Sequence, residues 1–167
     1  MIFDRVVSSS AIEAKGGAKE MVGSGVVAGI IGGMLMAMIM MMSTAANGMG
    51  FLAPLRLIAA TFHGKEAMAG GGPLLTGLMI HMMTSMVSGV IFASIVGRRL
   101  TLPQALMAGG AFGIAIWVVM TFGGLPLLNP IMRERVVMMP VAWFIAHLGF
   151  GMGLGAAPAL RRRSAAD

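Results

Sequence analysis

The sequence contains no cysteine and no tyrosine among its 167 residues. The absence of cysteine excludes disulfide bonds, thiolate zinc sites and thiol catalysis. Charged residues make up only 11% of the chain, whereas a soluble domain has roughly 25%. The long apolar runs contain no Asp, Glu, Lys or Arg. Ion-coupled transporters and proton pumps usually need a buried carboxylate, so only the histidines remain as intramembrane proton carriers.

Sequence motifs of enzyme chemistry are also missing. The chain has no glycine-rich phosphate loop with lysine and no His-Glu-x-x-His motif. Serine and histidine occur, but no nucleophile-elbow motif accompanies them and no acidic partner lies in an apolar run. The net charge of +6 comes from basic residues that flank apolar runs, which is the pattern of membrane topology. We therefore expect neither an enzyme nor a nucleic-acid partner.

Apolar residues dominate what is present. They make up 57% of the chain, and the mean hydropathy is +0.90. Four apolar runs are long enough to cross a bilayer, for which about 20 residues suffice. We predict an all-α polytopic membrane protein, with four transmembrane helices in one bundle domain over 21–160 and the lipid bilayer as its surroundings. The predicted spans are 21–45, 73–97, 103–123 and 137–160.

The segments outside the spans have fewer sequence features that predict their structure. Residues 1–20 are expected to form a cytoplasmic arm, and residues 161–167 a basic cytoplasmic tail. Within the loop 46–72, a proline start and a glycine stop predict an interfacial helix over 54–63. The loop 124–136 is proline-rich and has no strong period. The small residues at 43–45 resemble a cleavage site, but the apolar run before them exceeds the core of about 7–15 residues of a signal peptide, so we expect the first span to be retained.

Lysine and arginine predict the orientation. One side of the membrane would carry eight of them: Arg5, Lys15, Lys19, Arg98, Arg99, Arg161, Arg162 and Arg163. The other side would carry four: Arg56, Lys65, Arg133 and Arg135. Because positively charged loops stay in the cytoplasm, both termini are predicted to be cytoplasmic.

Small residues recur at every fourth position of the predicted spans, which is typical of faces on which membrane helices pack closely. Spans one and three share this pattern, and spans two and four each carry a histidine on a small-residue stripe. This alternation favours a two-plus-two hairpin repeat. The predicted packing residues are Gly25, Gly29, Gly33, Gly77, Ser85, Gly89, Gly109, Gly113, Gly151 and Gly155.

Two of the three histidines are candidate site residues. His81 and His147 lie at similar depth on spans that run in the same direction, so they could share a haem b or a transition metal as ligands. The preferred interpretation is structural, because hydroxyl side chains lie near enough on span two to bond a neutral histidine. A proton-relay or substrate-contact role is a further alternative. His63 is expected at the outer interface, with a weaker case as a third metal ligand.

The 20 methionines raise the question of copper, because thioether sulfur is a soft ligand for Cu(I). The six methionines between 34 and 42 point to all sides of one helix, since alternate residues are about 200° apart. Met79, Met83 and Met86 lie opposite His81. We therefore interpret the methionines as flexible core and lipid-facing residues rather than as a copper path.

Three segments resemble those of small uncharacterised bacterial four-helix membrane proteins: Pro54–Ala60, Gly77–Ser85 and Ile116–Met120. The resemblance implies the bacterial inner membrane and no particular activity. The preferred functional hypothesis is a non-enzymatic accessory or structural subunit that associates with other membrane subunits or with itself. A redox or metal module with His81 and His147 as ligands is the alternative, and a small transporter is the third.

Overall fold

The computed structural model describes residues 2–69, 73–96 and 100–164 of the chain, with side chains from residue 17 to residue 162 within these ranges. Everything described is helical or irregular, and no strand occurs there. Four helices are long and apolar enough to cross a membrane: Gly17–Ala46, Leu74–Ile95, Leu102–Leu128 and Pro140–Arg162. The prediction of an all-α polytopic bundle is confirmed.

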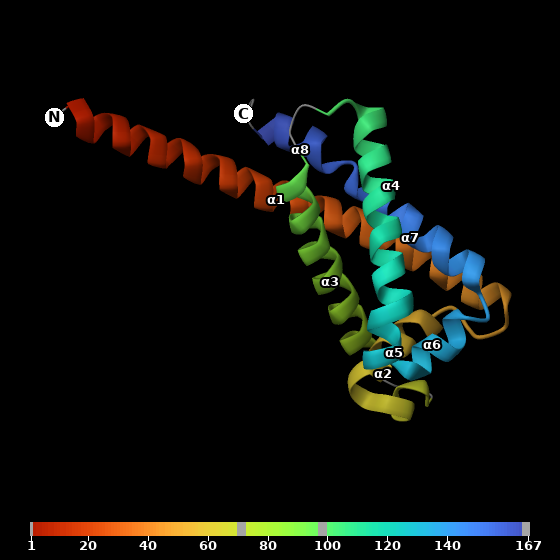
Figure 1. Ribbon diagram of the computed structural model, residues 1–167. Helices are drawn as coiled ribbons and strands as arrows, with labels where there is room; N and C mark the ends of the chain where they lie inside the picture. The colour runs from red at the N-terminus through yellow and green to blue at the C-terminus, as the bar shows by residue number, and fades with distance from the viewer. Residues whose placement is uncertain (1, 70–72, 97–99, 165–167) are drawn as a thin grey trace.

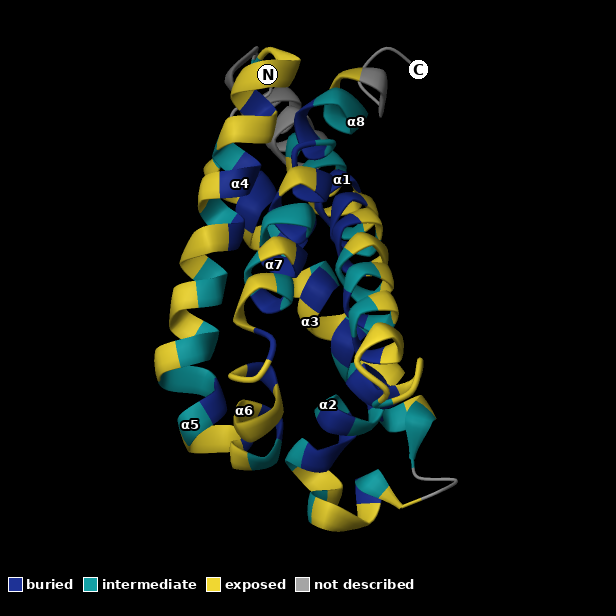
Figure 2. Ribbon diagram, turned by 90° about the vertical axis from the view of Figure 1, so that its right-hand side faces the viewer, coloured by how far each residue is buried: buried dark blue, intermediate teal, exposed yellow. Residues whose placement is uncertain are grey.

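The four long helices do not contribute equally to the core. α1 (Ile2–Ala46) packs against both α3 (Leu74–Ile95) and α7 (Pro140–Leu154), while α4 (Leu102–Val119) packs mainly on α7. Within the most apolar window of each span, 50% of the residues are buried in the fourth span and 11% in the third. Figure 2 shows the exposed residues along the outer side of α4. α4 is therefore the peripheral helix of the bundle.

Short helices close one end of the bundle. α2 (Ala53–His63) and the 3-10 helix η1 (Gly64–Met68) lie there together with α5 (Leu125–Leu128) and α6 (Pro130–Val136) (Figure 1). α2 packs against α3 and contacts α6. It ends at His63 and is capped by Gly64, which adopts a positive φ of 55° that most other residues avoid. The opposite end carries α8 (Ala157–Ser164), the C-terminal end of α3 and the N-terminal end of α4.

The region after the third span differs from the sequence-based expectation. The region 124–136, expected as a loop, is mostly helical, because α4 continues through the π-helix η2 (Met120–Gly124) into α5. α6 then begins at Pro130, where the Asn129 side chain accepts a hydrogen bond from the backbone N–H of Met132 at 2.9 Å. The first long helix, α1, begins at Ile2, and its N-terminal part projects away from the bundle (Figure 1).

Candidate functional site

A cleft with a volume of about 380 Å³ lies between α3 and α4. Residues of α1 and α7 also line it, and α2, α5 and α6 contribute at the end of the bundle that carries the short helices. One turn beyond the lining residues Ser88 and Ile116, the rings of Phe92 and Phe112 meet with centroids 5.4 Å apart. The cleft therefore occupies the half of the bundle on the α2 side of this aromatic contact.

His81 lines the cleft from α3 and is only 7% exposed. Its Nε2–H donates a hydrogen bond of 2.9 Å to the carbonyl oxygen of Gly33 on α1. That bond exists because α1 and α3 approach closely: a Cβ at Gly33 would lie 2.8 Å from the Cβ of Ser85. The bond places the proton on Nε2, so the lone pair of the neutral ring is on Nδ1.

His147 lines the same cleft from α7 and is 1% exposed. Its Nδ1–H donates to the carbonyl oxygen of Trp143 at 2.9 Å, and its ring stands edge-on to the Trp143 indole with centroids 4.2 Å apart. In the neutral ring the lone pair is then on Nε2. Among the described residues, neither Nδ1 of His81 nor Nε2 of His147 has a hydrogen-bond partner. The cleft thus contains two buried imidazoles with one free acceptor nitrogen each.

The small residues of the sequence stripes lie at helix contacts around these histidines. On the α1–α3 contact, Gly25, Gly29 and Gly89 face the backbone of the opposite helix, and Gly33 faces Ser85. On the α4–α7 contact, Gly109 and Gly113 face Gly151, and Gly155 faces Ala105. Gly77 faces the backbone of Leu55 on α2. At these glycines an added Cβ would meet its nearest neighbour at 3.0 Å or less, so a larger side chain would push the helices apart.

His63 lies apart from the other two histidines. It is exposed at the end of α2 and does not belong to the lining of the cleft. Within the described part of the chain, no group of three or more His, Cys, Asp or Glu side chains could hold a metal ion. The structure therefore brings His81 and His147 to one cleft and leaves His63 outside it.

Comparison with protein families gives a match over residues 19–165, which include both cleft histidines and all four long apolar helices except the first two residues of Gly17–Ala46. The chain belongs to DUF6789, a family of unknown function. No curated protein matches the chain, and neither does any solved structure. For this DUF6789 protein, functional inference therefore depends on the cleft itself.

Two features of the DUF6789 cleft were not identified from the sequence. Asn129 is 3% exposed, and its Nδ2 donates to two acceptors on α2, the Leu57 carbonyl at 2.7 Å and the Thr61 hydroxyl at 2.8 Å. The Asn-Pro pair at 129–130 is a helix-start signal that could have indicated its capping role. The π-helix η2 supplies Met120 and Gly124 to the cleft wall, and no sequence pattern predicted it.

Proposed function

We propose that this protein is a non-enzymatic membrane component whose cleft binds a small, uncharged, largely apolar molecule that carries a hydrogen-bond donor. The observation that supports this best is the pair of free acceptor nitrogens, Nδ1 of His81 and Nε2 of His147, in one cleft of about 380 Å³. Ligand sites in proteins are typically clefts of about 300–1,000 Å³ with apolar walls and a few placed polar groups. A hydroxyl or amide of the ligand would bond these nitrogens.

The absence of charge in the cleft defines the ligand class. No Asp, Glu, Lys or Arg is among the described residues that line it. A charged molecule would enter a low-dielectric site without a counter-charge, at a large desolvation cost. The cleft therefore suits a neutral molecule, and it offers no acid–base pair of the kind that hydrolysis requires.

The position of the cleft along α3 suggests an entry route. Thr84 lines the cleft, is exposed, and lies at the middle of the 22 residues of α3. Phe62 and Leu128, also in the lining, are 73% and 67% exposed. An opening at the middle of a transmembrane helix faces the hydrocarbon of the bilayer. In this proposal an apolar ligand enters sideways from the membrane, either for storage or presentation by an accessory subunit or for transfer by a small transporter.

The same geometry disfavours the haem alternative. A haem iron would bind the free nitrogen of His81, which is Nδ1, because Nε2 is bonded to Gly33. Nδ1 is next to the ring carbon that carries Cβ, so a planar macrocycle at Nδ1 would run into the α3 helix. A Soret band in the purified protein that His81→Ala and His147→Ala abolish would contradict this interpretation and support a bis-histidine haem b.

Tryptophan fluorescence offers a direct test, because Trp143 lines the cleft and Trp117 does not. The probes are para-bromophenol, which has a hydroxyl donor, and para-bromoanisole, its methyl ether, since bromine quenches a nearby indole. In Trp117→Phe, which keeps Trp143, we expect saturable quenching by the phenol and weaker binding of the ether. In Trp143→Phe, which keeps Trp117, we expect only the unsaturable quenching caused by partition into the detergent or membrane.

The histidines supply the second part of the test. Replacing both with leucine in the Trp117→Phe background is expected to lower the phenol affinity about tenfold, which is the value of roughly one net hydrogen bond. The affinity for the ether should change much less. Equal quenching of both tryptophans, or equal affinities for phenol and ether in the starting protein, would refute the proposed site.

A further inference from the structure

Most described hydroxyl side chains of the two long helices α1 and α3 bond to their own helix. They donate to a backbone carbonyl three or four residues earlier, which gives the hydroxyl proton an acceptor inside an apolar environment. The residues that do so are Ser24, Ser43, Thr44, Thr84 and Ser94. Ser85 and Ser88 of α3 line the cleft, and neither makes a hydrogen bond with any residue that the structure describes.

These two hydroxyls can be reached from the cleft. Ser85 is only 4% exposed and Ser88 is half-buried. Neither Oγ atom is sealed off, in contrast to Nε1 of Trp117, which is completely buried without a partner among the described residues. A polar group that lacks a hydrogen bond in an apolar site costs free energy, so each hydroxyl favours a ligand atom that accepts its proton. We call Ser85 and Ser88 the serine subsite.

The serine subsite begins directly beside the imidazole of His81. A Cβ built at Gly33 of α1 would lie 2.6 Å from Oγ of Ser85 and 3.6 Å from Nε2 of His81. Ser88 follows on the same side of α3, because positions i, i+4 and i+7 share one face of a helix. At 1.5 Å per residue, Ser85 lies about 6 Å and Ser88 about 10 Å from His81 along the helix axis. The three residues therefore form one polar row along the cleft.

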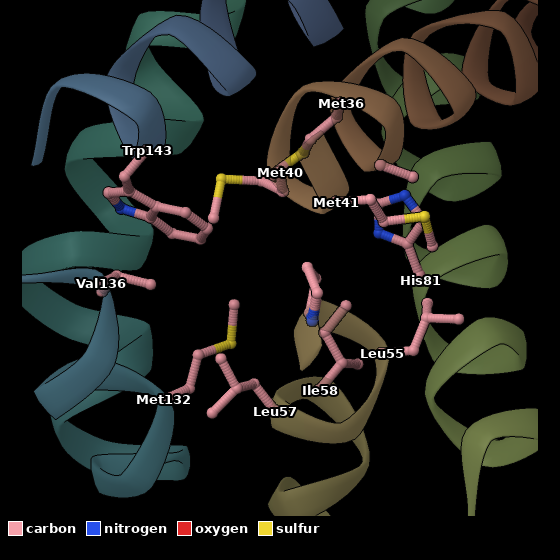
Figure 3. A pocket seen from close by; sticks show the side chains of 12 residues that line it. Met36, Met40, Met41, Leu55, Leu57, Ile58, His81, Met132, Val136 and Trp143 are labelled. Atoms are coloured by element: carbon pink, nitrogen blue, oxygen red, sulfur yellow. The ribbon is translucent and has the colours of Figure 1, made fainter. Parts of the chain in front are cut away.

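The other hydroxyl and amide groups of the cleft lining are already bonded. Thr84 donates to its own helix, and Asn129 and Thr61 are bonded to each other at the closed end. His81 also lines a second pocket of about 30 Å³, but the remaining lining of that pocket is apolar apart from the indole of Trp143 (Figure 3). A second polar group of a ligand bound at His81 therefore finds its partner in the serine subsite.

The walls of the cleft determine how such a ligand lies. The polar row belongs to α3, whereas α4 contributes the apolar side chain of Ile116. The row ends one turn beyond Ser88, where the rings of Phe92 and Phe112 meet. A fitting molecule therefore presents both of its polar groups to α3 and an apolar face to α4.

We propose that the cleft holds a neutral hydroxy-carbonyl compound, whose hydroxyl donates to a free histidine nitrogen and whose carbonyl oxygen accepts from the serine subsite. The inference rests on the proposed function and narrows its ligand class, because a ligand with a donor alone would leave the hydroxyl protons of Ser85 and Ser88 unpaired. Esters of 4-hydroxybenzoic acid have this pattern. One benzene ring separates their hydroxyl from the carbonyl, a length comparable to the single turn of about 6 Å between His81 and Ser85.

The test is a competition in the Trp117→Phe protein, in which para-bromophenol reports occupancy of the cleft by quenching Trp143. The competitors are methyl 4-hydroxybenzoate, which has the carbonyl, and 4-propylphenol, which has the same length and lacks it. Both are used at a pH at which they are neutral. Partition into the detergent is the same for every variant, so it cancels when the ratio of the two affinities is compared between variants.

In Ser85→Ala/Ser88→Ala we expect this ratio to shift about tenfold towards 4-propylphenol, which is the value of roughly one net hydrogen bond. The matched control is Ser94→Ala, because Ser94 is an exposed serine of the same helix that lies outside the cleft lining and bonds to its own helix. The ratio should be unchanged there. Para-bromophenol has no carbonyl, so its own affinity should change little in the double variant, which shows that the cleft is intact.

Each outcome of this competition decides a stated point. If para-bromophenol binds but the ratio does not shift in the double variant, or shifts equally in Ser94→Ala, the serine subsite is refuted while the proposed function stands. If the double variant loses para-bromophenol binding, the single variant Ser88→Ala replaces it, and an unchanged ratio there refutes the subsite. If para-bromophenol does not quench Trp143 saturably in the starting protein, the proposed function is refuted and this inference with it.

Discussion

His81 and His147 each use one ring nitrogen for a backbone carbonyl, and they use different ones. For His147 the acceptor is its own helix, four residues earlier, so a sequence can suggest it. For His81 the acceptor is Gly33 on another helix, 48 residues away. Sequence spacing placed both histidines on small-residue stripes, but it could not tell which nitrogen stays free, because that depends on how α1 lies against α3.

The first prediction at this scale concerns Gly89. A Cβ at this position would lie 2.8 Å from the Cα and N atoms of Gly29, and backbone atoms cannot move aside as a flexible side chain does. We expect Gly89→Ala to lower the free energy of unfolding in detergent by about 1–3 kcal/mol, the usual cost of overpacking.

Gly23 on α1 is the matched control, because nothing lies within 4 Å of a Cβ built there. Gly23→Ala should leave stability unchanged or raise it by up to about 1 kcal/mol, since alanine favours a helix more than glycine does. Equal effects of the two substitutions, measured by the same denaturation assay, would contradict the close α1–α3 contact at Gly89.

At the scale of elements, hydropathy predicted the four long helices well, because a run of about twenty apolar residues is typical of a transmembrane helix. The short helices α5 and α6 were not predicted, because four and seven residues are too few to show a period. The cleft depends on these short elements. Its end is held by Asn129, whose side chain joins α2 to the start of α6.

The π-helix η2 is the element whose role is easiest to test. The Thr121 hydroxyl within it accepts a hydrogen bond of 2.9 Å from Nε1 of Trp143, which is 3% exposed. Thr121→Val would leave this N–H buried without an acceptor, at a cost of about 1–3 kcal/mol in the free energy of unfolding. The fluorescence of Trp143, isolated in the Trp117→Phe background, should shift at the same time.

Thr84→Val serves as the comparison for this second prediction. The Thr84 hydroxyl is exposed and donates to the Ile80 carbonyl of its own helix. Its loss should change the free energy of unfolding by no more than about 0.5 kcal/mol. If Thr121→Val lowered the free energy of unfolding no more than Thr84→Val does, the hydrogen bond from Trp143 to Thr121 would not be what holds η2 against α7 at this wall of the cleft.

For the whole molecule, the sequence predicted the class and the number of spans but not their arrangement. The outward and inward faces of these helices are both apolar, so hydrophobic periodicity cannot show which helix is central. Small residues point to close contacts, yet they do not say which helix is the partner. Only the structure shows that α1 and α7 are central, that α4 is peripheral, and that a cleft lies between α3 and α4.

Orientation is the prediction that belongs to the whole chain. The distribution of lysine and arginine predicts that residues 1–20 are cytoplasmic and that α2 and η1 lie on the outer side. Because the natural chain has no cysteine, single substitutions are clean reporters. In intact bacterial cells a membrane-impermeant maleimide should label Lys65→Cys, and it should label Ser10→Cys only after permeabilisation. The reverse labelling pattern would show that the predicted orientation is wrong and that residues 1–20 lie outside.

The packing of α4 on α7 has a consequence for how the chain is made. During synthesis α1 and α3 enter the membrane early and can join as soon as both are present. α4 follows them, but its main neighbour, α7, is made only after α5 and α6. A nascent chain that has reached α4 therefore carries a helix without its final neighbour, and the bundle cannot be completed until α7 has also been made.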